Sequence, residues 1–202
     1  MELPRDKNGK TEAEFLRDYN VTKYFRPSVT VDAVLYRRAE NGRLRILFIK
    51  RGGHPFIGKY AFPGGFVEQS EPCEDAAYRE LNEETGVTGV PLRQLITASA
   101  PDRDPRWRNI TAVFCGEAGE ISAQAGDDAA DAQWFDIAYN REDGTLLFEC
   151  AETSERFECR LDIRRDAFGK IDLNKTRISE RGLTAFDHAA ITAYLFEFIF
   201  DA

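Results

Sequence analysis

Glu80 and Glu84 occupy positions where carboxylates are unusual in a helix of a globular protein. The segment that begins at Cys73 places small and apolar residues at helical spacing as far as Leu81. On a helical wheel of about 100° per residue, both glutamates lie within about 20° of Cys73, in the middle of this apolar face, with Glu83 beside them. Burying an unpaired carboxylate is costly, and adjacent carboxylates repel each other at the negative end of a helix dipole. The spacing therefore predicts a cationic partner.

A divalent metal ion is the partner that fits these carboxylates. Arg79 can reach Glu83 one turn away, but one guanidinium cannot neutralise three negative charges. Mg²⁺ accepts a few carboxylates, keeps several water ligands and bridges to substrate phosphates, and Mn²⁺ takes similar ligands. The alternative is a solvated, glutamate-rich helix end, which the wheel position and Arg79 disfavour. We therefore expect a site for Mg²⁺ or Mn²⁺.

The elements that must position this helix predict an α/β fold. The helix is expected to start near Ser70 as its N-cap, with Glu71 and Pro72 in the first turn, and to end at Gly86. A short helix capped by Thr11 precedes the first strand. Strand-like segments are found at residues 28–37, 43–50, 61–67, 92–98 and 110–115, and at Trp134-Phe135. Together they predict a mixed sheet with helices packed on it.

The C-terminal third of the chain adds two further elements to this prediction. Apolar and polar residues alternate within residues 139–179, which favours an inserted or edge β-hairpin with one buried face. Asp187 is expected to cap a helix over residues 185–200, which packs on the sheet by one apolar stripe. The stripe consists of Ile191, Tyr194, Leu195, Phe198 and Ile199. At 202 residues with 43% hydrophobic residues, the chain is expected to form one domain with an insertion.

The composition of the chain limits the classes of partner and the cellular compartment that we expect. A net charge of −8 argues against a general nucleic-acid-binding surface. No apolar run reaches membrane-spanning length, and the start at Met1 lacks the pattern of a signal peptide. The four cysteines show no C-x-x-C spacing; Cys150 and Cys159 could meet across the hairpin, but a role as small apolar fillers is favoured. We expect a reduced, cytoplasmic protein without a membrane or nucleic-acid partner.

The catalytic helix and the loop before it resemble the Nudix hydrolases. Residues 65–71 (GFVEQSE) and 79–87 (RELNEETGV) match every specified position of the Nudix box, G-x5-E-x7-R-E-U-x-E-E-x-G-U, where U is a bulky aliphatic residue. The resemblance implies an α/β/α sandwich with a mixed sheet. It also implies hydrolysis of the diphosphate in a nucleotide-like substrate, supported by Mg²⁺.

The same resemblance assigns roles to the residues of the box. It implies that Glu80 and Glu84 are the firmest metal ligands, that the Gly65 carbonyl is a further ligand, and that Glu83 is either another ligand or the general base. Arg79 and Glu71 are similar to residues that brace the loop and the glutamates. The base could instead come from the loop at residues 119–131, which offers Glu120, Asp127 and Asp128. For these two aspartates, turn formation is an equally good interpretation.

Outer motifs are similar to those of the ADP-ribose pyrophosphatase-like branch. They are YFRPSVTVD at 24–32, HPFIGKYAFPGGFV at 54–67, DRDPR at 102–106, GDDA at 126–129 and AFDHA at 185–189. Arg51 and Arg106 flank the box and could hold phosphates, or could form surface ion pairs. Tyr60, with Phe56 and Trp107, could stack on a base, although an aromatic residue beside a loop is more often part of the core. His188 is expected to be structural, and His54 to be at most a loop contact.

The resemblance leaves several functions open. ADP-ribose hydrolysis to AMP and ribose 5-phosphate is favoured, with a sugar nucleotide, a dinucleotide or a nucleoside triphosphate as alternative substrates. A non-catalytic, ligand-sensing transcriptional regulator is the alternative from another class, which the presence of all the box glutamates disfavours. The resemblance also implies a homodimer.

Overall fold

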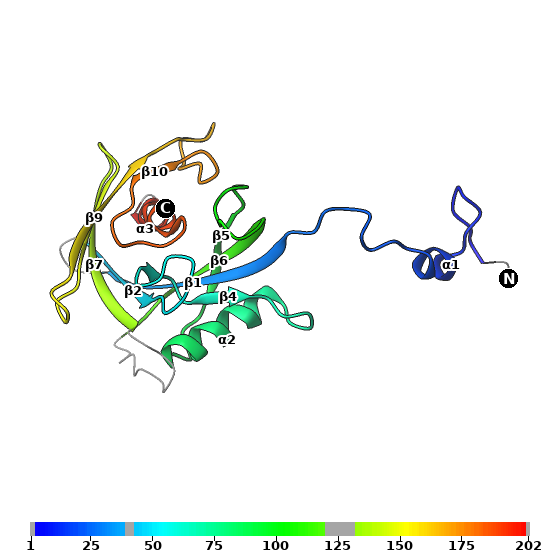
Figure 1. Cartoon of the computed structure of the whole chain (residues 1–202), viewed down its shortest axis with the longest axis horizontal. Helices are drawn as coiled ribbons and strands as arrows, with labels where there is room; N and C mark the ends of the chain where they lie inside the picture. Colours follow the sequence, from blue (N-terminus) through cyan, green and yellow to red (C-terminus); the bar gives the residue numbers. More distant parts are fainter. Residues whose placement is uncertain (1–2, 39–42, 120–131, 201–202) are drawn as a thin grey trace.

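In the part of the chain that the structure describes, ten strands form a strongly curved sheet, and there are three helices (Figure 1). The computed structural model describes residues 3–38, 43–119 and 132–200. The helices are α1 (Glu12–Arg17), α2 (Cys73–Thr85) and α3 (His188–Phe200). The strands are β1 (Ser28–Arg38), β2 (Leu44–Lys50), β3 (Tyr60–Ala61), β4 (Gly64–Phe66), β5 (Arg93–Ala98), β6 (Asn109–Glu117), β7 (Ala132–Asn140), β8 (Thr145–Glu149), β9 (Arg156–Asp162) and β10 (Arg177–Glu180).

The sheet is mixed, as the sequence predicts. Its strand order is β10-β9-β8-β7-β2-β1-β6-β5, and β3 and β4 pair with β2 and β1. The central strands β1 and β6 run parallel, and the other neighbouring strands run antiparallel. Because β4 pairs with β1, the loop that leads into α2 is fixed to the middle of the sheet.

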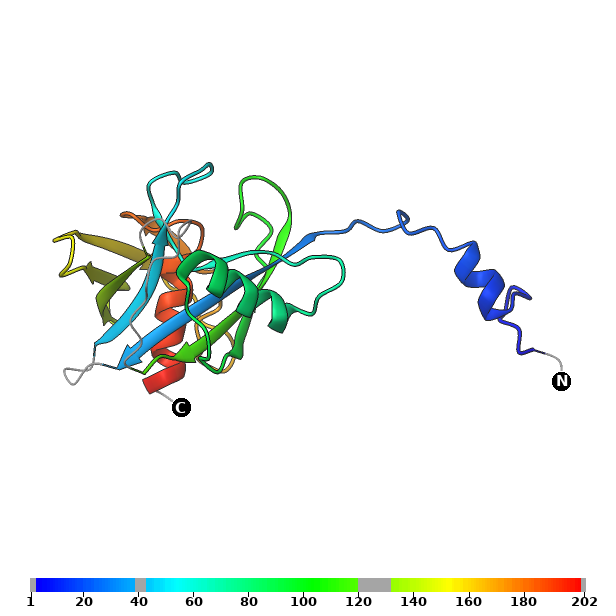
Figure 2. The same ribbon diagram turned by 90° about the horizontal axis from the view of Figure 1, so that it is seen from below.

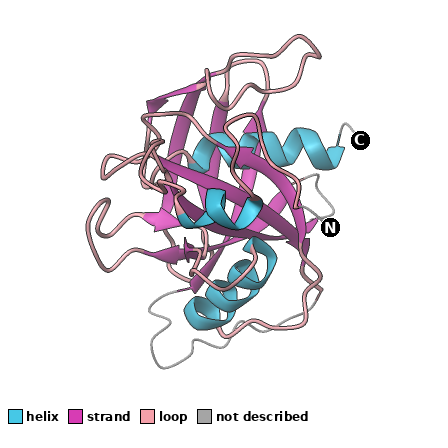
Figure 3. Cartoon of the chain, turned by 90° about the vertical axis from the view of Figure 1, so that its right-hand side faces the viewer, coloured by secondary structure: helices cyan, strands magenta, loops and turns pink. Residues whose placement is uncertain are grey.

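Helices α2 and α3 cover opposite faces of this sheet (Figures 1 and 3), which confirms the α/β sandwich. The apolar face of α2 packs on the sheet through Ala76, Ala77 and Leu81, all fully buried. α3 is enclosed more completely than a helix with one apolar stripe, because the outer strands curl around it (Figure 1). Ala190, Ala193 and even Glu197 are buried, so the prediction of a single packing stripe was wrong.

The beginning of α2 differs from the sequence prediction. The helix begins at Cys73, with Pro72 as the N-cap and without a side-chain cap, rather than at Ser70. Proline suits this end of a helix because its missing N–H would have no partner within the helix. The other end is as predicted: Gly86 terminates the helix with a φ of 67°, in the left-handed region.

Residues 139–179 contain the predicted edge hairpin, formed by β8 and β9, in which Leu146 pairs with Cys159 and Phe148 with Phe157. They belong to an antiparallel meander, β7 to β10, which continues the main sheet beyond β2. β7 runs over nine residues and is much longer than the short strand expected at Trp134-Phe135. The meander carries the sheet around α3, and Cys150 and Cys159 fill its buried face as free thiols.

The N-terminal arm, residues 3–27, extends away from the sheet (Figures 1 and 2). Its helix α1 begins with the predicted cap, in which Thr11 and Glu14 form a reciprocal capping box. None of the residues of α1 is buried. Among the described residues, no helix combines the length and the apolar character that a membrane crossing requires.

Candidate active site

A cavity of about 450 Å³ opens where β1, the β3–β4 loop, α2 and the start of α3 meet. It brings together parts of the chain that are far apart in the sequence. The polar and charged residues that line it are Thr30, Asp32, Arg51, Glu68, Arg79, Glu80, Glu84, Arg103, Asp104, Arg106, Thr111 and His188. Carboxylates and arginines therefore share one cavity.

Glu84 is a carboxylate held inside this cavity by the backbone at the start of β4. Its Oε2 accepts a hydrogen bond from the Gly64 N–H, at 2.8 Å. Burial, together with the nearby Glu80, raises the pKa of Glu84 to about 7, although the Gly64 bond opposes the shift. Within the described part of the chain, Glu84 forms no salt bridge. The charge of the nearby Arg51 also favours the ionised form, but it does not outweigh burial.

Glu80 lies directly against Gly65. A Cβ atom on residue 65 would lie 2.3 Å from the Glu80 Oε1, closer than real Cβ atoms approach any atom. Only glycine therefore allows the carboxylate of Glu80 to lie beside the backbone of this loop. The side chain of Glu80 is 14% exposed, and it accepts a hydrogen bond from the Arg79 Nη1 at 2.8 Å. This contact explains structurally why the box requires glycine at its first position.

Arg79 braces the loop and the helix, as expected. Its guanidinium donates to Glu71 at 2.7 Å and 3.1 Å and to the Phe66 carbonyl at 3.1 Å. It also reaches Glu83, at 3.0 Å. The hydrogen bonds that Arg79 donates to Glu71 and Glu80 hold its pKa above its usual range. One arginine thus connects both ends of the Nudix-like segment.

The structure separates Glu83 from the other two glutamates. Its side chain is 57% exposed, and Glu83 is not among the residues that line the cavity. Glu80 and Glu84 line the cavity together with Gly65. The helical wheel had placed Glu83 beside these two carboxylates, whereas the structure leaves it largely exposed.

The donor atoms fit a divalent ion that keeps some of its water ligands. Glu80 and Glu84 supply two carboxylates, and Gly65 supplies a backbone carbonyl beside them. Among the described residues, no three acidic, histidine or cysteine side chains cluster closely enough to form an all-side-chain metal site. Two carboxylates with backbone, water and phosphate oxygens are typical of Mg²⁺ sites.

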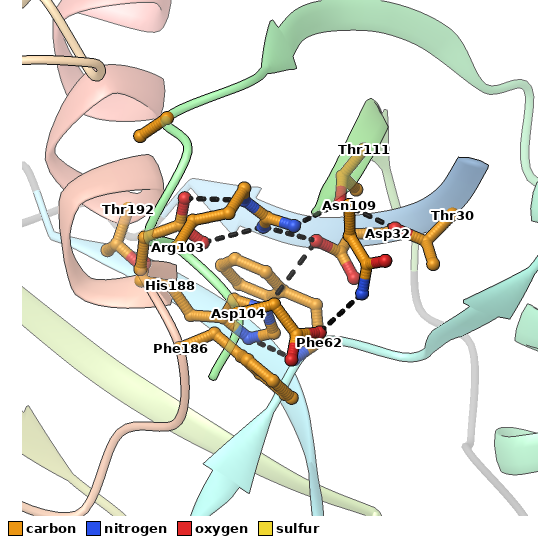
Figure 4. Close-up of polar contacts among 12 residues, drawn as sticks. Thr30, Asp32, Phe62, Arg103, Asp104, Asn109, Thr111, Phe186, His188 and Thr192 are labelled. Atoms are coloured by element: carbon orange, nitrogen blue, oxygen red, sulfur yellow. Dashed lines mark hydrogen bonds and ion pairs between the residues drawn. The ribbon is translucent and has the colours of Figure 1, made fainter. Parts of the chain in front are cut away.

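A buried polar network that the sequence reasoning did not find forms the opposite wall (Figure 4). Arg103 is at its centre, with a side chain that is 5% exposed. Its guanidinium donates two bonds to Asp187, at 2.9 Å and 2.6 Å, and lies 3.7 Å from Asp32. Burial alone would lower the pKa of Arg103, but the two aspartates raise it above the usual value. A further bond from Arg103 to the Thr111 hydroxyl attaches the network to β6.

His188 belongs to the same wall, and its tautomer follows from its contacts. Its Nδ1 accepts a hydrogen bond from the Phe62 N–H at 2.9 Å, so the proton of the neutral ring is on Nε2. That nitrogen lies 3.5 Å from the Asp32 Oδ2. The ring also stacks on Phe62, with 4.6 Å between centroids. His188 is therefore structural, as expected, and it also lines the cavity.

Arg51 and Arg106 both line the cavity. The Arg51 Nε donates to the Pro55 carbonyl at 2.8 Å, and burial beside Arg106 lowers the pKa of Arg51. Arg106 forms an ion pair with Asp104, at 2.7 Å, and its side chain remains 42% exposed. The sequence left open whether Arg106 holds phosphate or forms an ion pair. Arg106 forms an ion pair, and it also lines the cavity.

Tyr60 is not in the cavity, and its predicted contact with substrate was wrong. It is 1% exposed and packs between Phe135 and Phe157, which β7 and β9 supply. Its hydroxyl bonds to Gln133 and Glu155. Trp107 is 61% exposed and contacts Phe25. The candidate bases Glu120, Asp127 and Asp128 lie outside the described residues.

The residues of this network come from three distant segments, and of these the sequence pointed only to His188, as a structural residue. Asp32 lies on β1, Arg103 in the β5–β6 loop, and His188 at the first residue of α3. The runs DRDPR and AFDHA, which contain Arg103 and His188, were signals that could have found two of them. The signal for Asp32 is that it is a single acidic residue inside an otherwise apolar strand.

Comparison with known proteins agrees with this geometry. The chain is 43% identical over 114 residues to an ADP-ribose pyrophosphatase from Methanocaldococcus jannaschii, which is 56% of this chain and 64% of that protein. It is 35% identical over 109 residues to the ADPR responsive transcriptional repressor NtrR of Acinetobacter baylyi, covering 53% of this chain and 43% of that protein. The chain thus spans less than two thirds of these relatives.

Solved structures and the family match extend the comparison. A MutT/nudix family protein from Enterococcus faecalis has a TM-score of 0.73 and 33% identity, over 95% of this chain and 70% of that chain. The NUDIX domain of Shewanella oneidensis NrtR, complexed with ADP ribose, has a TM-score of 0.55 and 31% identity, over 62% of this chain and 82% of that chain. The NUDIX domain family matches residues 26–146, more than half of the sequence, and the chain belongs to this family.

Proposed function

We propose that the protein is a pyrophosphohydrolase that uses Mg²⁺ or Mn²⁺ to hydrolyse ADP-ribose to AMP and ribose 5-phosphate. The observation that carries the proposal is the pairing of Glu80 and Glu84 at Gly65, in one cavity with Arg51 and Arg106. The similarity to an ADP-ribose pyrophosphatase supports the choice of substrate. In this reaction one water adds across the P–O–P bond, and each product keeps one phosphate.

Some residues of the cavity would hold the metal ion, and others orient these ligands. Glu80, Glu84 and the Gly65 carbonyl would hold the ion, which supplies charge neutralisation at the diphosphate and a more acidic water. The Gly64 N–H fixes the carboxylate of Glu84, and Arg79 fixes that of Glu80. These contacts preorganise the acidic end of the cavity before substrate binds.

The cationic end of the cavity would bind the diphosphate. The Nε of Arg51 is held by the Pro55 carbonyl, which leaves its two Nη groups for phosphate oxygens. Arg106 is oriented by Asp104, which is itself held by the Asn109 amide at 2.6 Å. Glu83, or a carboxylate in residues 120–131, is proposed to accept the proton from the attacking water.

The substrate is tested by turnover of a panel with and without metal. ADP-ribose, NADH, diadenosine polyphosphates and nucleoside triphosphates are incubated with Mg²⁺, and the phosphate released by a coupled phosphatase is measured. ADP-ribose is expected to have the highest kcat/KM. EDTA should abolish turnover, and Mg²⁺ or Mn²⁺ should restore it. If another compound has a higher kcat/KM than ADP-ribose, that compound is the substrate instead.

The same panel tests a ligand-sensing regulator, which the similarity to NtrR supports. Thermal unfolding is followed with each compound beside the turnover assay. A regulator would show a ligand-dependent rise in Tm without turnover of any compound. The presence of Glu80 and Glu84 in the cavity favours the enzyme.

A homodimer is also proposed, with the N-terminal arm as its contact. Large apolar side chains of the arm are at least 45% exposed: Leu3, Phe15, Leu16, Tyr19, Val21, Tyr24 and Phe25. Residues 3–27 carry six cationic and four acidic side chains, whereas the whole chain has a net charge of −8. The arm is therefore apolar and basic, which suits docking on a second, acidic copy.

Light scattering after size exclusion tests the dimer. The full chain is expected at twice its mass of 22.9 kDa, and the double variant Phe15→Ser, Leu16→Ser at the monomer mass. α1 has no buried residues, so these substitutions leave the core intact. If the wild type has the monomer mass, the proposed dimer is wrong. If the double variant has the dimer mass, the dimer contact does not lie at Phe15 and Leu16.

A further inference from the structure

A second, smaller cleft adjoins the candidate active site. It has a volume of about 170 Å³ and lies between the β5–β6 loop, β10 and the start of α3. Arg103 and Phe186 line both this cleft and the active-site cavity, so they form a shared wall. Phe186 is held in this position with a φ of 45°, and its ring packs on Phe56.

Two arginines that line this cleft, Arg177 and Arg181, form no salt bridge within the described residues. The charge of Arg103 is already matched by Asp187 and Asp32. Arg177 donates to the carbonyls of Asn174 and Thr176, and Arg181 to that of Phe186. Neither arginine forms a salt bridge with a carboxylate in the described ranges, and Asp102 is the remaining acidic residue at the cleft.

Of the two arginines, Arg181 gives the stronger indication of an anion site, because it is half-buried. Its guanidinium lies over the Phe56 ring, with 5.0 Å to the centroid, and the residue is half-buried. Burial lowers the pKa of Arg181, with Asp187 acting in the opposite direction. A partly desolvated cation that forms no direct salt bridge gains more from a bound anion than a fully hydrated cation does.

The size and the donors of the cleft indicate the class of anion. Its volume is several times the roughly 30 Å³ that one molecule occupies in liquid water, which is enough for a tetrahedral oxyanion. Arginine forks match the geometry of phosphate oxygens. We propose that Arg177 and Arg181 form a phosphate-monoester subsite beside the active site, which binds either free phosphate or a terminal phosphate of the substrate.

The substrate-borne form of this proposal rests on the proposed hydrolase function, whereas the binding of phosphate itself does not. Calorimetric titration with inorganic phosphate in EDTA therefore tests the subsite without any turnover. Arg177→Gln and Arg181→Gln are each expected to weaken phosphate binding about tenfold, as the loss of one charge-assisted hydrogen bond would. The matched control is Arg156→Gln, an arginine with a 65% exposed side chain that lines neither cavity.

A second experiment identifies the source of the phosphate. It compares kcat/KM for ADP-ribose and for its 2′-phosphate. If the substrate carries the phosphate, the two variants lower kcat/KM about tenfold for the phosphorylated compound and leave that for ADP-ribose unchanged. If free phosphate is the ligand, both substrates behave alike and only the phosphate titration changes.

The result that overturns the proposal is equal phosphate affinity in the wild type, Arg177→Gln and Arg181→Gln. Loss of phosphate binding in Arg106→Gln alone would also overturn it, because it would place the anion in the active-site cavity. Within the described residues, the side-chain hydrogen bonds of Arg177 go to the carbonyls of Asn174 and Thr176, so Arg177→Gln remains informative if loss of the Phe186 contact unfolds Arg181→Gln.

Discussion

Glu84→Gln is expected to lower kcat for ADP-ribose by about 100-fold or more, with the fold retained. Glutamine keeps the size of the side chain and can still accept the Gly64 N–H, but it removes the negative charge that would hold the metal ion. Because the folded protein raises the pKa of Glu84, the substitution is also expected to leave stability unchanged or to increase it. Steady-state kinetics and thermal unfolding of the variant measure both effects.

Two neighbouring glutamates of α2 are the comparisons for this result. Glu74→Gln, on the exposed first turn, should retain wild-type turnover. Glu83→Gln should lose turnover by orders of magnitude if Glu83 is the base, and an unchanged rate would leave that role to Glu120, Asp127 or Asp128. A Glu84→Gln variant with wild-type kcat would remove Glu84 from the proposed mechanism.

Arg103→Met is expected to reduce the free energy of unfolding by about 3–5 kcal/mol, the range for breaking a buried ion pair. Methionine fills part of the space of the arginine stem but leaves Asp32 and Asp187 without their shared cation. Urea unfolding measures the loss. Activity should fall as well, because Arg103 lines the cavity.

A surface pair provides the control for Arg103. Arg45 forms a salt bridge with Asp136 at 2.7 Å, but the side chains are 36% and 26% exposed. Arg45→Met should therefore cost about 1 kcal/mol or less. Equal losses for Arg45→Met and Arg103→Met would show that the buried network contributes little more than a surface pair.

The acidic end of the site could be predicted because its information is local. Glu80 and Glu84 lie on one helix, and helical spacing alone places them on the buried face. Arg103, Asp32 and His188 converge from a loop, a strand and a helix end, so their proximity depends on the tertiary fold. A single sequence carries no periodicity that connects such segments.

The errors in the fold have a related physical origin. Alternating residues in 139–179 correctly indicate the edge hairpin of β8 and β9, but alternation does not show that β7 and β10 extend this hairpin into a meander of the main sheet. Its curvature encloses α3 and covers Tyr60 with Phe135 and Phe157. An aromatic residue beside a loop therefore became part of the core.

Product analysis of ADP-ribose tests the proposed reaction most directly. Purified protein is incubated with ADP-ribose and Mg²⁺, and the products are separated by anion exchange. Hydrolysis of the diphosphate predicts AMP and ribose 5-phosphate in equal amounts, and neither product when EDTA is present. Intact ADP-ribose, or ADP and free ribose as the products, would contradict the proposed reaction.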